Sequence, residues 1–147
     1  MNDFVALSQI TLEEALNCMK PYQKASFLEL IPIYGEEESA KRWVSSSGPG
    51  GLDKFGGSMG SRKPFWDSLV LEFRMFVCGH EKYAEQRSKI KALSDKHLNN
   101  LVLAISGAIA FSIGVATALV VPVVSILCYL AGQIGINAWC ATSDDAT

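Results

Sequence analysis

Residues 97–143 contain no Asp, Glu, Lys or Arg, and this uncharged run constrains the fold more than any other feature of the chain. Its centre, Leu101 to Cys140, consists mainly of Leu, Val, Ile, Ala, Gly and Phe. A bilayer core is about 30 Å thick and is crossed by about 20 apolar residues in a helix. The run is therefore long enough for two crossings, and it predicts a membrane protein.

The two halves of the run differ in strength. Leu101–Val121 holds eleven Leu, Ile, Val or Phe residues, each of which favours insertion by about 0.3–0.6 kcal/mol at mid-helix. We expect this segment to cross the membrane. Pro122 is expected either to form the turn of a hairpin or to kink one continuous helix. Val123–Cys140 is less apolar, so the alternative to a second crossing is a helix that lies at the interface.

A hairpin buried in a soluble protein is a further alternative. Two helices that are apolar on all sides need other helices around them. The preceding 96 residues include a Gly-rich stretch, so the sequence predicts too few helices to enclose the hairpin in a monomer. A buried hairpin would then belong to a dormant state that later inserts, or to an oligomer.

Residues 1–96 carry all 13 Lys and Arg residues and 13 of the 15 acidic ones. Thr11 and Glu14 match a capping box at a helix start. Further helices are expected over Tyr22–Leu30, where Pro32 should stop the helix, and over Glu36–Val44. No run of period two suggests a strand. The formal net charge of −2 gives no basic surface for nucleic acid.

The sequence thus predicts an all-α protein, with a small N-terminal helical domain followed by a C-terminal transmembrane hairpin. The expected divisions are the N-terminal helical region 1–47, a Gly-rich linker 48–63, amphipathic and basic helices 64–97, the hairpin 98–141 and an acidic tail 142–147.

Basic residues indicate the orientation. Four of them precede the first crossing: Arg87, Lys89, Lys91 and Lys96. Cytoplasmic loops are enriched in Lys and Arg, so we expect the N-terminal domain to lie in the cytoplasm and the hairpin in the inner (plasma) membrane. The same residues would also suit anionic lipid head groups.

The cysteines are far apart and form no CxxC pair: Cys18, Cys78, Cys128 and Cys140. Cys128 falls inside the apolar run. This spacing favours free thiols in a reducing compartment over a disulfide scaffold.

Small residues recur at every fourth position of the first segment: Ser106, Ala110, Gly114 and Ala118. Such a ladder lets helix backbones approach closely in a bilayer, either within the hairpin or in a homo-oligomer. Gln133 and Asn137 lie four residues apart on the second segment. Amides within a bilayer seek partners or water, so these two would line a pore, bond to the first helix or lie near the head groups.

Residues suited to catalysis are few, and we expect no enzyme, cofactor or metal. Arg74 and His80 have the Arg-x5-His spacing that resembles the loose motif of HEPN ribonucleases, and that resemblance implies acid–base work on RNA by the histidine. Cys78 and His80 would supply only two of the three or four ligands that a zinc site needs.

Three hypotheses for the function follow. The first is a small membrane effector that binds lipid, assembles through its hairpin and permeabilises the bilayer, as a toxin or anti-phage component would. The second is a membrane-anchored adaptor that docks a cytosolic partner through Trp66, Phe73 and Phe76 or through Tyr22–Leu30. The third is a membrane-tethered nuclease that uses Arg74 and His80.

Overall fold

The computed structural model describes residues 10–47, 62–92 and 98–146. These residues form helices without a strand, as the sequence predicted; the Gly-rich linker lies outside the described residues. In chain order the elements are α1 (Leu12–Leu16), α2 (Pro21–Tyr34), α3 (Glu36–Ser47), α5 (Arg62–Val77), the 3-10 turn η3 (Glu81–Tyr83), α6 (Ala84–Ala92), α7 (Leu98–Ile113), α8 (Thr117–Ile134) and α9 (Ile136–Ala146).

Local signals define the first helices. The capping box of α1 is confirmed, because the Thr11 hydroxyl accepts a hydrogen bond from the Glu14 N–H and the Glu14 carboxylate accepts one from the Thr11 N–H. The prediction that Pro32 stops α2 is wrong. Pro32 lies in the last turn, where its missing N–H removes one hydrogen bond only, and α2 ends at Gly35 with φ +85°.

The apolar stripe of α5, which lies where the sequence predicted an amphipathic helix, forms the centre of the core. Leu69, Phe73 and Phe76 are fully buried, and α5 ends before Gly79. Gly79 adopts φ +95°, and the His80 N–H donates to the Met75 carbonyl at 3.0 Å. A glycine in the left-handed region with this hydrogen bond is the Schellman end of a helix.

The turn between the two apolar helices lies at Gly114 and not at Pro122, so the first of the two alternatives for Pro122, a hairpin turn, is wrong. Gly114 has φ +89°, and the Val115 N–H donates to the Ala110 carbonyl at 3.0 Å, which ends α7. Pro122 lies inside α8. A proline there leaves the carbonyl four residues earlier, that of Ala118, without its helical donor. Gln23 supplies the replacement: its Nε2 donates to the Ala118 carbonyl at 3.1 Å.

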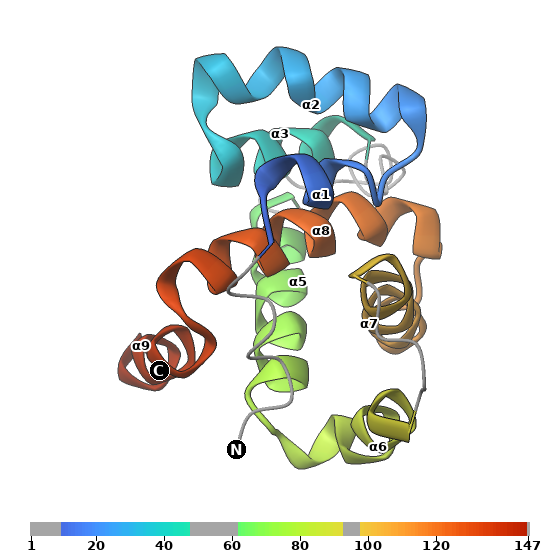
Figure 1. Ribbon diagram of the computed structural model, residues 1–147, viewed down its shortest axis with the longest axis vertical. Coiled ribbons are helices and arrows are strands. Elements are labelled where there is room, and N and C mark those ends of the chain that lie inside the picture. The colour runs from blue at the N-terminus through green and yellow to red at the C-terminus, as the bar shows by residue number, and fades with distance from the viewer. Residues whose placement is uncertain (1–9, 48–61, 93–97, 147) are drawn as a thin grey trace.

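The helix α8 lies across the middle of the molecule and packs against α1, α3, α5, α7 and α9 (Figure 1). Helices α2 and α3 lie beside each other at one end, and α6 lies at the other. The prediction that too few helices exist to enclose the hairpin is wrong for α8, because helices from the N-terminal and the C-terminal parts of the chain pack against it and 61% of it is buried.

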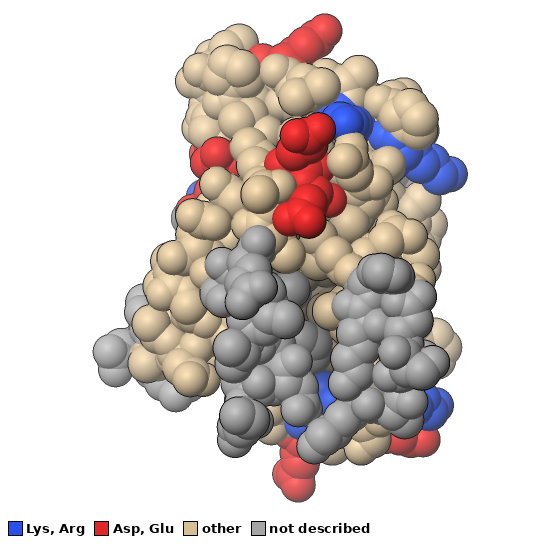
Figure 2. Space-filling model, viewed as in Figure 1, with Lys and Arg blue, Asp and Glu red and all other residues tan. Residues whose placement is uncertain are grey.

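The charged side chains in this view lie mainly at the two ends of the molecule and away from the core around α8 (Figure 2). Figure 2 shows acidic and basic side chains over the α1–α3 end and at the α6 end, whereas the side chains that are described at the α8–α9 corner are uncharged. On α3, two i, i+4 ion pairs join Lys41 to Glu37 and Arg42 to Glu38. Such exposed pairs add little stability, so the fold depends on the apolar core.

Candidate functional site

The candidate functional site is the apolar hairpin α7–α8 together with the groups that hold it in place. Within the described residues, α8 is the one helix long and apolar enough to cross a membrane: it has 18 residues with a mean hydropathy of 1.9. At 1.5 Å per residue it extends about 27 Å. In this fold 61% of α8 is buried inside the protein. The apolar surface that would be compatible with lipid therefore packs in the protein core.

The helix α7 is shorter and two-sided. Its 16 residues extend about 24 Å. Val102, Ile105 and Ile109 are fully buried, whereas Phe111 is 91% exposed and Leu103 is 46% exposed. The predicted crossing over Leu101–Val121 therefore corresponds to one short helix, a turn and the start of α8.

The small-residue ladder is divided by the turn at Gly114. Ser106 and Ala110 are buried on α7, Gly114 ends that helix, and Ala118 is exposed on α8. A Cβ added at Gly114 would meet nothing within 4 Å. The special property of Gly114 in this fold is its positive φ and not a close approach between helices.

The two amides predicted as pore lining lie on different helices. Gln133 is exposed near the end of α8, and Asn137 is exposed on α9. Gly135, with φ +101°, separates them. Their i, i+4 spacing therefore does not place them on one helical face.

The aromatic residues considered for partner docking are in the core. Trp66 is 7% exposed, and Phe73 and Phe76 are fully buried. Phe73 meets Trp139 of α9 edge-on, with ring centroids 5.4 Å apart. In this conformation these side chains hold the helices together and are not available to a partner.

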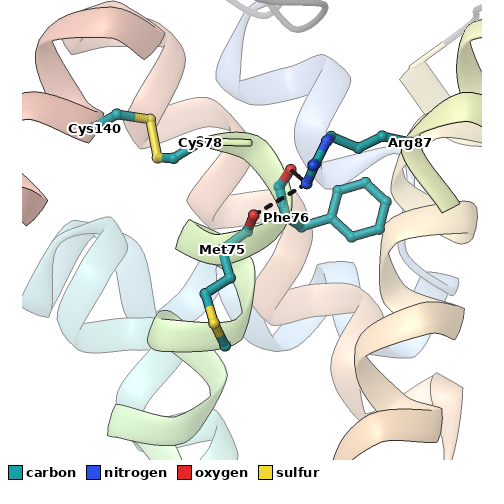
Figure 3. Close-up of a disulfide and its surroundings, with 5 residues drawn as sticks. All are labelled: Met75, Phe76, Cys78, Arg87 and Cys140. Atoms are coloured by element: carbon teal, nitrogen blue, oxygen red, sulfur yellow. Dashed lines mark hydrogen bonds between the residues drawn. A yellow bond between two sulfur atoms is a disulfide. The ribbon is translucent and has the colours of Figure 1, made fainter. Parts of the chain in front are cut away.

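The basic residues before the hairpin have structural contacts where they are described. Arg87 Nη1 donates to the carbonyls of Met75 and Phe76 at 3.3 and 3.1 Å (Figure 3). A cation at the last carbonyls of α5 also complements the helix dipole. Lys89 lies 3.9 Å from Glu85 in an exposed i, i+4 pair. The Lys91 side chain and Lys96 lie outside the described residues.

The expectation of unpaired cysteines is wrong for two of the four. Cys78 and Cys140 form a disulfide between the end of α5 and α9, across 62 positions of sequence (Figure 3). The closed loop contains α6, α7 and α8, so the disulfide fastens both ends of the segment that carries the hairpin. The sequence spacing of Cys78 and Cys140 does not predict that they pair, because the packing of the helices between them determines how far apart the two sulfurs lie.

Of the two free cysteines, Cys128 is fully buried and Cys18 is partly buried. Burial, and then the negative charge of Glu14, raise the pKa of the Cys18 thiol to about 11. Cys18 is thus held as the neutral, weakly nucleophilic thiol.

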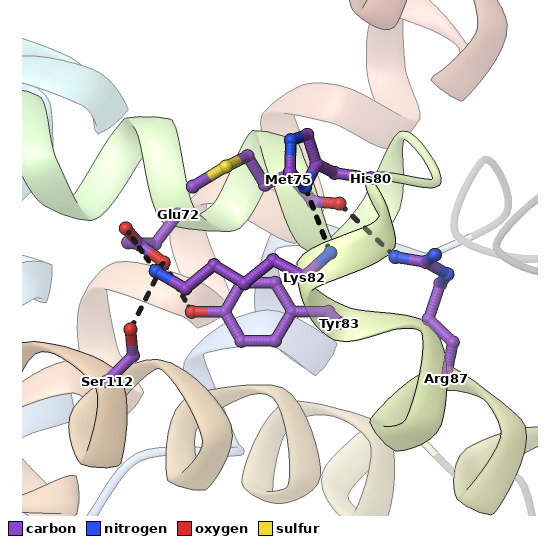
Figure 4. A network of polar contacts seen from close by, with 7 residues as sticks. All are labelled: Glu72, Met75, His80, Lys82, Tyr83, Arg87 and Ser112. Atoms are coloured by element: carbon purple, nitrogen blue, oxygen red, sulfur yellow. Dashed lines mark hydrogen bonds and ion pairs between the residues drawn. The ribbon is translucent and has the colours of Figure 1, made fainter.

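A polar cluster fastens α7 to the end of α5 (Figure 4). Glu72 Oε1 accepts a hydrogen bond from Lys82 Nζ at 2.8 Å and others from the hydroxyls of Tyr83 and Ser112. Burial first, and then the hydrogen bond to Glu72, raise the pKa of Tyr83 to about 12. The cluster keeps Tyr83 as a neutral donor that joins η3 to α5.

Arg74 and His80 have separate contacts. His80 is exposed, and its Nδ1 accepts a hydrogen bond from the Lys82 N–H at 3.0 Å, which caps η3. The Arg74 guanidinium lies over the Trp139 ring, 5.2 Å from its centroid. The part of the chain that the structure describes contains no group of three His, Cys, Asp or Glu residues able to hold a metal ion.

A groove of about 500 Å³ opens between α5 and the C-terminal half of α8. We call it the α5–α8 groove. Its floor includes Val70, Leu127 and Leu130, and Arg74 and Trp139 also line it. No sequence signal indicates this groove, since its lining residues on α5 and α8 are more than fifty positions apart.

No family model matches the chain, and no curated protein or solved structure matches it significantly.

Proposed function

We propose that this chain is a membrane effector whose apolar hairpin is stored inside a closed helical fold and leaves it to enter a bilayer. One observation carries the proposal. The helix α8 has the length and composition of a membrane span, yet 61% of it is buried, against helices from the N-terminal and the C-terminal parts of the chain. A helix with these two properties has two favourable environments, the core and the lipid.

The energies of the two environments are comparable. Nine Leu, Ile and Val residues of α8 at about 0.3–0.6 kcal/mol each favour insertion by about 3–5 kcal/mol. Domains of this size are stable by about 5–15 kcal/mol. A change of a few kcal/mol in the closed fold is therefore enough to shift the balance between storage and insertion.

The Cys78–Cys140 disulfide is the group best placed to control that balance. While it is intact, α9 stays fastened to the end of α5, and α8 stays between them. Cys78 is exposed, so a dithiol reductant has access to it. Thiol–disulfide exchange converts the pair into two thiols and oxidises the dithiol to its own disulfide. Disulfides persist in oxidising compartments and are reduced in the cytosol. An oxidising compartment therefore favours the disulfide-bonded closed fold, and the cytosol favours the reduced form.

The test uses the purified full-length chain with vesicles that contain anionic lipid and an encapsulated dye. We expect the oxidised protein to release little dye and the protein treated with dithiothreitol to release it and to float with the vesicles. The Cys78→Ser/Cys140→Ser variant should act without reductant. Cys18→Ser is the matched control and should still require it.

Two results would contradict the proposal. One is a reduced protein that neither floats with vesicles nor releases dye. The other is equal release by the oxidised and reduced forms, which would mean that the disulfide does not restrain the hairpin. In cells, rapid loss of membrane potential on expression of the full chain is expected if insertion permeabilises the membrane.

The second candidate function is an adaptor, and the surface of α2 favours it. Four large apolar side chains of α2 are exposed: Tyr22, Leu28, Ile33 and Tyr34. Tyr22 and Ile33 are eleven positions apart and therefore lie on the same side of the helix, and exposed apolar patches often mark protein contacts. Ile33→Asp should abolish binding to a partner in the adaptor and leave vesicle insertion unchanged in the effector, because Ile33 is 71% exposed and contributes little to the core.

A further inference from the structure

The α5–α8 groove has the size of a ligand site. Its volume of about 500 Å³ lies within the range of about 300–1,000 Å³ found for small-molecule pockets, which are mostly apolar with a few placed polar groups. Leu71 and Ile134 at its edges are 46% and 58% exposed. Apolar side chains that line an open groove gain free energy when an apolar ligand covers them.

Arg74 is the cation in this groove. Its guanidinium lies on the Trp139 ring, and its Nε is buried without a hydrogen-bond partner among the described residues. The other arginines whose side chains are described have polar partners: Arg42 pairs with Glu38, and Arg87 donates to two carbonyls. A guanidinium presents five donors in a planar fork that matches a carboxylate or a phosphate.

Two acidic residues also line the groove, at its solvent side. Glu37 is exposed and lies 4.0 Å from Lys41, and Asp67 is exposed. Exposed charges are screened by water and salt much more than partly buried ones. The half-buried Arg74 therefore decides which charge the interior of the groove attracts.

We propose that the α5–α8 groove binds an amphiphile with one anionic head group, a carboxylate or a phosphate, and an alkyl chain. The head group pairs with Arg74 beside Trp139. The chain lies along Val70, Leu127 and Leu130, over the stretch of α5 between Arg74 and Trp66, which extends about 12 Å. Part of this site, Leu127, Leu130 and Ile134, belongs to α8, so the ligand binds the closed fold; its binding does not depend on whether the hairpin ever inserts.

Calorimetric titration of the oxidised full-length protein with dodecanoate and dodecyl phosphate, below their micelle concentrations, tests the site. We expect saturable binding at one site, and binding at least tenfold weaker for dodecanol and for dodecyltrimethylammonium. Arg74→Gln should weaken dodecanoate binding about tenfold or more, since a charge-assisted pair is lost. Arg42→Gln removes an exposed arginine and should stay within about twofold of wild type.

Leu130→Trp tests the apolar half of the site with Arg74 intact. The larger side chain fills the groove, and we expect dodecanoate binding to be lost while the circular dichroism spectrum is unchanged. Equal affinity of Arg74→Gln and wild type, equal binding of the cationic amphiphile, or no saturable binding would each overturn the proposal.

Vesicles identify the source of the ligand. If the groove takes a lipid from a bilayer, the oxidised wild type should float with vesicles of phosphatidylglycerol and Arg74→Gln should not. If it takes a free amphiphile, monomeric dodecanoate binds and neither protein floats. Both results support an anionic amphiphile in the groove. Neither measures dye release, so this test is independent of the test of hairpin insertion.

Discussion

The contact between Gln23 and the start of α8 leads to a prediction with a defined magnitude. Pro122 has no N–H to donate to the Ala118 carbonyl, and Gln23 Nε2 donates to that oxygen in its place at 3.1 Å. Gln23 is only 2% exposed. Gln23→Leu leaves the carbonyl without this donor, and a hydrogen bond of this kind contributes about 0.5–1.5 kcal/mol to stability.

Pro122→Ala is the matched second change, because alanine restores the helical N–H that bonds to Ala118. In that background the carbonyl has its donor whether or not Gln23 is present. Gln23→Leu should therefore cost about 0.5–1.5 kcal/mol less in the Pro122→Ala protein than in wild type. The hydrogen bond that Gln23 Oε1 accepts from the Lys20 N–H is lost in both backgrounds and cancels.

Urea unfolding of the four proteins of this cycle, followed by circular dichroism, gives the four free energies. The proteins are compared in the same oxidised state, so the disulfide loop is constant. A coupling energy below about 0.5 kcal/mol is within the additivity of independent sites. That result would refute the argument that Gln23 compensates for the proline.

Three further predictions concern other parts of the fold. Removing the disulfide by Cys78→Ser/Cys140→Ser frees a loop of 62 positions and should cost about 4 kcal/mol of unfolding free energy, with no effect of reductant on the variant. Gly107→Ala should stabilise α7 by about 0.5–1 kcal/mol, whereas Gly114→Ala, at φ +89°, should destabilise the protein by about 1–2 kcal/mol; thermal melts with the same sign for both would contradict this. The raised pKa of Tyr83 means that the fold favours the neutral phenol, so this stabilisation is complete below about pH 10 and is lost as the pH rises toward about 12. Urea unfolding from pH 8 to 11 should show a smaller decline for Tyr83→Phe.

Short-range signals in the sequence predicted the local structure well. Thr11 with Glu14 caps α1, and Gly79 ends α5, because each acts on backbone groups within five residues of itself. The apolar stripe on α5 likewise placed Phe73 and Phe76 on one face. The errors at Pro32 and Pro122 have a common cause: a proline removes one donor, and only the surroundings decide whether a helix tolerates that loss.

The candidate site was harder to predict, since its parts come from distant segments. Neither Cys78 nor Cys140 has a neighbouring cysteine, and the folding of α6, α7 and α8 between them brings the two sulfurs together. Arg74 was noted for its spacing to His80, but its contact is with Trp139. Burial of Trp66 also follows from the packing of helices and not from its local sequence.

By itself the sequence determined that the chain is helical and that residues 97–143 avoid charge, because helix periodicity, capping and hydropathy are properties of neighbouring residues. The tertiary structure alone decided where that uncharged run lies, which cysteines pair, which donor satisfies Ala118 and where the α5–α8 groove opens. The physical reason is that apolar surface gains free energy from leaving water whether it enters a protein core or a lipid bilayer. Hydropathy therefore identifies the segment, and only the packing of the other helices around α8 places it in the core of this fold.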